Sequence, residues 1–151
     1  MLDELVQVSV SLRLEKSQKC LQAAQILLAS ESFADAANRS YYCIFHAMQA
    51  VLITSGFSAK THSSSITEFR KSFIRTGLFP QHYSDFIGDA FTVLSKSDYD
   101  IFYVIKKAEV AQQIENAKEF LSAVEAYIEK VTTEETVPNV ADNFRNSSGE
   151  N

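Results

Sequence analysis

Apolar residues recur along most of the chain at steps of three or four, the spacing that places them on one face of an α-helix. Between Leu2 and Ser30 they form a single stripe, which predicts a long amphipathic helix. Residues 8–11 are a candidate break in it, because β-branched and serine residues cluster there. The segment from Phe33 to Ser55 is apolar around most of its circumference, so we expect it to be the most buried helix. Gly56, directly after it, is typical of a helix end.

The same pattern continues in three further segments. A third helix is expected after the polar loop at residues 57–64, a fourth over residues 80–94 and a fifth over residues 107–131. The intervening stretch, residues 95–107, contains two aspartates that disfavour a helix interior. We therefore expect this stretch to be irregular.

Residues 132–151 differ sharply in composition from the rest of the chain. They are polar and carry almost no apolar pattern, which predicts a disordered tail. Residues 1–131 then form one domain of ordinary size. With only four glycines and two prolines in 151 residues, many tight turns are unlikely. The sequence predicts an all-α fold, an up-and-down bundle of four to five helices.

The composition also bears on the compartment. No apolar stretch reaches the roughly 18–20 residues that a membrane span requires. The first ten residues carry two acids and no base, unlike a secretory signal. Cys20 and Cys43 are spaced neither as a disulfide framework nor as a metal site, and we expect both thiols to be buried. These features predict a cytoplasmic protein that does not contact membranes.

Charge and motif content exclude several kinds of chemistry. A net charge of −5 argues against a large sequence-independent DNA-binding surface, although it permits a local basic patch. The three histidines, at positions 46, 62 and 82, have no metal-ligand spacing on a common helix. The chain also lacks a glycine-rich phosphate loop, an HExxH motif and a CxxC motif. We expect no metal and no cofactor.

Arg39, Tyr42 and His46 fall on one face of the most apolar helix, within two turns. Polar side chains in such a position are costly unless each finds a partner. One interpretation is an internal network with Asp35 or another carboxylate, which ties helices together. The other is a cleft in which Arg39 binds a phosphate group and His46 handles a proton. The spacing does not separate the two.

Two further segments carry candidate chemistry. Lys60 and His62 stand where the third helix begins, and they either attract an anion there or accompany simple capping. Asp98 and Tyr99 mix an acid with a phenol in the expected loop. That loop either holds a carboxylate tether to Arg39 or forms part of a binding surface.

Taken together, these segments resemble the HEPN domain family, in particular its small stand-alone prokaryotic members. The resemblance covers about residues 10–130 in the right order, and it rests on the segments 38–47, Gly56, 60–62, 96–100 and 111–120. It implies an up-and-down helical bundle that forms a homodimer. It also implies a partner protein, often nucleotidyltransferase-like, in a toxin–antitoxin or defence setting.

Active relatives are metal-independent ribonucleases with an Arg-x4-6-His motif late in the bundle, and this sequence departs from that motif. Leu94 stands where relatives of this branch commonly carry the arginine, and Tyr99 stands where the histidine would be. An uncharged leucine cannot stabilise a phosphorane-like transition state, and tyrosine is a poor base near neutral pH. Arg39 and His46 satisfy the same formula on an earlier helix.

The leading interpretation is therefore a HEPN-like binding module rather than an enzyme. It would be a homodimer that works with a nucleotidyltransferase-like partner and binds nucleotide or RNA. The residues expected to form the binding surface are Arg39, Tyr42, His46, Lys60, His62, Asp98 and Tyr99. The alternatives are a metal-independent ribonuclease toxin, in which Arg39 and His46 are catalytic, and a purely structural helical scaffold.

Overall fold

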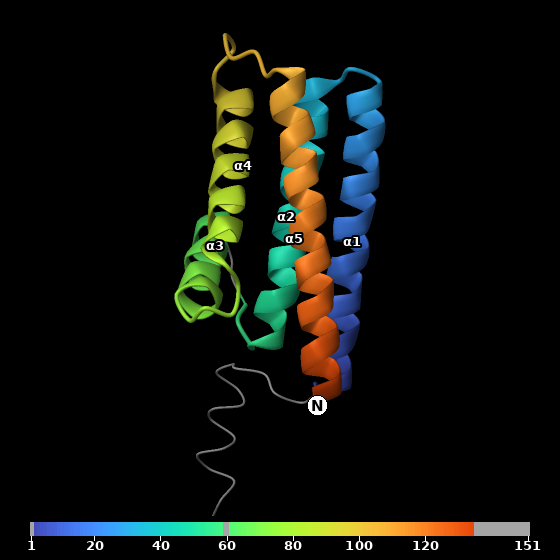
Figure 1. The fold of residues 1–151 in the computed structure, drawn as a ribbon, viewed down its shortest axis with the longest axis vertical. Coiled ribbons are helices and arrows are strands. Elements are labelled where there is room, and N and C mark those ends of the chain that lie inside the picture. The colour runs from blue at the N-terminus through green and yellow to red at the C-terminus, as the bar shows by residue number, and fades with distance from the viewer. Residues whose placement is uncertain (1, 59–60, 135–151) are drawn as a thin grey trace, which may run out of the picture.

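The computed structural model describes residues 2–58 and 61–134 of the chain. The described residues form five α-helices and one π-helical segment, with no strand among them. Their bounds are α1 Glu4–Ala29, α2 Phe33–Thr54, α3 His62–Phe69, η1 Arg70–Ile74, α4 Gln81–Tyr99 and α5 Lys107–Glu134. The four long helices alternate in direction along the chain, with α2 and α5 between α1 and α4 (Figure 1). The prediction of an all-α, up-and-down bundle is confirmed.

Helix α2 is the centre of the bundle. It contacts each of the other four α-helices. Fourteen of its 22 residues are buried, which confirms the expectation drawn from its apolar circumference. Its end also follows the prediction, because Gly56 adopts a φ of +81°. The amide groups of Gly56 and Phe57 donate to the carbonyl groups of Ile53 and Leu52, the paired bonds of a Schellman motif.

A cluster of aromatic rings from α3, η1 and α4 completes the core. Phe69, Phe73 and Phe79 are at most 3% exposed, and their ring centroids lie 5.5–6.2 Å apart. Phe86 and Phe91 are partly buried and pack against the same core. Edge-to-face and offset contacts at these separations add to the free energy of apolar burial.

The expected breaks in the first and fourth helices are both wrong. Helix α1 continues through residues 8–11, because Val10 is buried against the core and packing outweighs the small helix-propensity cost of valine and serine. Helix α4 continues to Tyr99, five residues past the expected end. Val93 and Leu94 are buried in this part of the helix, while Asp98 is exposed and loses no hydration there.

Helix α5 ends at Glu134, so residues 132–134, which were expected to begin the tail, are helical. Val131 is 1% exposed, and its burial holds the last turns of the helix against the core. The rest of the expected tail, residues 135–151, lies outside the described residues. Within the described ranges no helix combines the length and apolar character that crossing a bilayer requires.

Candidate functional site

The first part of the candidate site is the start of α3, where His62 is the first helical residue. The Thr61 side chain caps the helix by accepting from the amide of Ser64, and the Ser64 side chain accepts from the amide of Thr61 in return. This capping box fixes the direction in which His62 leaves the backbone. The imidazole packs on the Phe45 ring, with the centroids 4.3 Å apart. The helix therefore begins inside the polar loop expected at residues 57–64, with Thr61 as its cap and His62 at its start.

The Tyr41 hydroxyl joins His62 to the central helix. Tyr41 Oη lies 3.1 Å from His62 Nδ1. Burial raises the pKa of Tyr41, so the phenol stays protonated at neutral pH and can donate to the imidazole. The Tyr42 ring lies edge-on to His62, with 5.8 Å between the centroids. His62 therefore packs against aromatic rings of α2.

Arg39 has a different partner from the one expected. Its Nε and Nη2 groups donate to the Asn38 side-chain oxygen at 3.0 and 2.8 Å, and Nη1 lies 3.7 Å from the Cys20 sulfur. Its guanidinium carbon is 5.2 Å from the centroid of the Tyr42 ring. Among residues 2–58 and 61–134 no carboxylate forms an ion pair with Arg39. The network with Asp35 is therefore wrong.

His46 forms a contact with α1 that the sequence did not reveal. Arg13 Nη1 lies 2.9 Å from His46 Nδ1. Because a guanidinium only donates, Nδ1 is the acceptor and the ring proton is on Nε2. Burial, followed by the charges of Arg13 and Lys16, lowers the pKa of His46 to about 4. His46 is therefore neutral at physiological pH.

These contacts gather positively charged and titratable groups from three helices on one face. We refer to Arg13, Lys16, Arg39, His46 and His62 as the basic cluster. The charges of Arg13, Lys16, Arg39 and His62 all contribute to the lowered pKa of His46, and no acidic group does. An excess of positive charge that no acid offsets attracts anions.

The remaining predicted site residues are Lys60, Asp98 and Tyr99. Lys60 lies outside the described residues. Asp98 and Tyr99 are exposed in the last turn of α4, and in the described part of the chain no hydrogen bond or ion pair links them to Arg39. The expected carboxylate tether from this segment is wrong. Leu94, which we expected to replace the family's arginine, is 8% exposed and belongs to the core.

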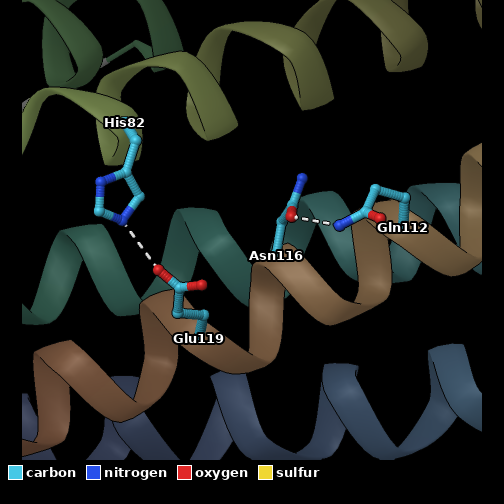
Figure 2. Close-up of polar contacts among 4 residues, drawn as sticks. All are labelled: His82, Gln112, Asn116 and Glu119. Carbon is cyan, nitrogen blue, oxygen red and sulfur yellow. Dashed lines mark hydrogen bonds and ion pairs between the residues drawn. The ribbon is translucent and has the colours of Figure 1, made fainter.

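The third histidine lies on another face, between α4 and α5 (Figure 2). His82 Nε2 is 2.8 Å from a Glu119 carboxylate oxygen, and Gln112 donates to Asn116 one turn earlier on α5. Across the described residues, no three acidic, histidine or cysteine side chains are arranged to hold a metal ion. Cys20 and Cys43 are buried free thiols, as expected, and burial raises the pKa of Cys43 to about 12.

Comparison with known proteins places the chain in a family. The sequence model of the HEPN domain matches residues 10–127, a range that contains the whole basic cluster. The chain belongs to the HEPN domain family. This confirms the resemblance seen in the sequence.

Relatives in this family come from archaea and bacteria. A Methanocaldococcus jannaschii protein named "Putative toxin MJ0142" is 31% identical over 76% of this chain and 78% of its own length. A Thermotoga maritima protein named "UPF0332 protein" is 31% identical over 76% of this chain and 86% of its own length. An Archaeoglobus fulgidus protein of the same name is 26% identical over 80% of this chain and 96% of its own length.

Proposed function

We propose that this HEPN protein is a toxin-like module that binds RNA or a nucleotide through the basic cluster. The observation that carries the proposal is that Arg13 contacts the half-buried His46 while Arg39 lies over the Tyr42 ring beside it, and that the charges of Arg13, Lys16 and Arg39 lower the pKa of His46. Phosphate groups are the anions that arginine recognises best, through its planar fork of donors. The word toxin in the printed name of the Methanocaldococcus relative supports the same setting.

The aromatic side chains of the face support nucleic acid as the ligand. Tyr42 lies within 6.1 Å, between ring centroids, of both His46 and His62, and under the Arg39 guanidinium. Stacking of unpaired bases on tyrosine, histidine and guanidinium planes is the usual way in which proteins hold single-stranded RNA. A net charge of −5 opposes broad, non-specific binding, so we expect binding to be confined to this face.

The state of His46 favours binding over catalysis. A general acid must carry a proton at working pH, and His46, with a pKa of about 4, does not. Its Nδ1 lone pair is occupied by Arg13, and a base of this pKa accepts protons weakly near neutral pH. Leu94 and Tyr99 cannot replace the arginine and histidine of active relatives. A ribonuclease that uses Arg39 and His46 is therefore the second candidate.

We further propose that the protein works as a homodimer with a nucleotidyltransferase-like partner. At the end of α4 and in the loop that follows it, Tyr99, Ile101, Phe102 and Val104 are 80–90% exposed. Four neighbouring side chains of this kind exceed what a monomer ordinarily leaves in water. We refer to these four residues as the apolar loop, and we expect it to be covered in the dimer.

The proposal is tested by measuring binding of a fluorescent single-stranded RNA to Arg39→Gln by anisotropy. Arg75→Gln is the matched control, because Arg75 is exposed and its replacement removes the same charge at a position that is distant from Arg39 in sequence. We expect Arg39→Gln to weaken binding about tenfold, the effect of losing one charge-assisted contact of roughly 1.4 kcal/mol. Equal affinity of the two variants would contradict the proposal. RNA cleavage by the wild type without metal, lost in His46→Ala, would favour the ribonuclease.

A further inference from the structure

A second cavity, outside the basic cluster, lies between α3 and α4. Its volume is about 300 Å³, and the residues that line it include Ser63, Thr67, Arg70, Gly88, Phe91 and Thr92. It therefore presents one guanidinium, three hydroxyl groups and one aromatic ring. No carboxylate is among the described residues that line it.

Arg70 is the only cation among these lining residues, and the structure fixes its position. Its Nε group donates to the Ser84 hydroxyl at 2.8 Å, and Nη2 lies 3.4 Å from the Ser84 carbonyl oxygen. The residue begins the π-helical segment η1, an uncommon backbone form that recurs at functional sites. Because Ser84 holds one edge of the guanidinium, the remaining N–H groups of Arg70 can donate to a ligand.

Gly88 makes room for this arrangement. A Cβ atom at position 88 would lie 3.0 Å from Arg70 Nη2, closer than such atoms ordinarily approach. Glycine in the middle of a helix destabilises the helix relative to alanine. The absence of a side chain at Gly88 therefore lets the guanidinium lie against α4, beside the cavity.

In the described part of the chain, no acid offsets the charge of Arg70. It is half-buried, and within residues 2–58 and 61–134 it forms no ion pair with an acid. The hydroxyls of Ser63 and Thr67, both on exposed residues, form no hydrogen bond within those ranges and are free to donate to a ligand. A partly desolvated cation beside unpaired hydroxyl donors is stabilised when an anion with several oxygens occupies the space.

We propose that this cavity binds a phosphate monoester, such as a mononucleotide or the terminal phosphate of an RNA strand, with Arg70 as its principal ligand. A terminal phosphate offers three free oxygens, enough for the guanidinium and for the hydroxyls of Ser63 and Thr67.

The cavity adjoins the basic cluster but is separate from it. The Phe91 ring, which lines the cavity, lies 5.9 Å from the Tyr41 ring, and Tyr41 contacts His62 on its other side. The proposed phosphate site therefore does not depend on RNA binding at the basic cluster. The two proposals can be tested independently of each other.

The test is a titration of the isotope-labelled full chain with inorganic phosphate, followed by NMR through the Gly88 amide and the Arg70 Nε–H signals. In the wild type both signals should move to saturation. Arg70→Gln should weaken phosphate binding at least tenfold at Gly88, whereas Arg75→Gln, which loses the same charge, should bind as the wild type does. Equal binding by these two variants, or no response of Gly88, would overturn the proposal.

Two further measurements keep the result clear. Gly88→Ala retains every charge and strengthens the helix, yet should weaken phosphate binding several-fold because the guanidinium must shift. If Arg70→Gln fails to fold, Gly88→Ala provides the test instead. Unchanged phosphate affinity in Gly88→Ala would contradict the proposed geometry.

A trinucleotide RNA with a 5′-phosphate should move the Gly88 signal at lower concentration than its 5′-hydroxyl counterpart. Equal responses to the two would refute the monoester assignment.

Discussion

Replacing His46 with asparagine should remove a pH-dependent part of the protein's stability. The folded protein holds the pKa of His46 at about 4, through burial and the neighbouring charge of Arg13. The same side chain in the unfolded chain has a pKa of about 6.5. Asparagine places an amide oxygen near the position of Nδ1, where it can still accept from Arg13, but it does not titrate.

The sign of the effect follows from proton uptake. Above about pH 6.5 His46 is neutral in both states and pH has no effect through it. As the pH falls from 6.5 towards 4, the unfolded chain takes up a proton that the folded protein refuses, so the wild type loses stability. At pH 5 this amounts to about 2 kcal/mol, which we discount to roughly 1 kcal/mol because His46 is only half-buried.

The assay is urea denaturation of the wild type and His46→Asn at pH 8, 6 and 5. Every other side chain is the same in the two proteins, so the difference between their unfolding free energies isolates His46. That difference should shift in favour of the variant by about 1 kcal/mol between pH 8 and pH 5. A constant difference, or a His46 ring signal that titrates near pH 6.5 by NMR, would refute the electrostatic account of the basic cluster.

Two other substitutions test separate parts of the account. Phe102→Asp places a charge in the apolar loop, where Phe102 is 85% exposed, and light scattering should show a shift from dimer to monomer with little change in melting temperature. A wild type that is already monomeric at micromolar concentration would contradict the dimer. Leu94→Arg combined with Tyr99→His rebuilds the family's arginine–histidine spacing, but it buries a cation in the core. We expect several kcal/mol of destabilisation by chemical denaturation, and a stable, folded variant would show that position 94 is not structural.

Helix positions were predictable because they depend on local periodicity. The stripe of α1 and the apolar circumference of α2 are each visible within a few turns of sequence. Gly56 marked a helix end because only glycine adopts positive φ there at little cost. The predicted breaks at residues 8–11 and 95–99 failed, because burial of Val10 and Leu94 outweighs local propensity.

The candidate site was only partly predictable, because its contacts join residues that are distant in sequence. Arg39, Tyr42 and His46 could be placed on one face by helical spacing alone. Arg13 is 33 residues from His46, and its role depends on how α1 lies against α2. A signal was available, however. The turn between these helices is short, so residues at similar distances from it, such as Arg13 and His46, pair across the antiparallel helices.

The partners of Arg39 were mispredicted for a related reason. The nearby acid Asp35 was the expected partner, but it is exposed, and Arg39 instead contacts Asn38 and the buried Cys20. A neighbouring amide and a sulfur atom satisfy the guanidinium without cancelling its charge. No carboxylate among the described residues therefore offsets the charge of Arg39, which composition alone could not reveal.

The salt dependence of RNA binding tests the central claim most directly. For single-stranded RNA, each phosphate contact contributes about 0.7 to the slope of log affinity against log salt concentration. The double variant Arg13→Gln with Arg39→Gln should therefore show a slope about 1.4 smaller in magnitude than that of the wild type, with both affinities measured by anisotropy. A double variant that binds RNA with the affinity and slope of the wild type would contradict the account.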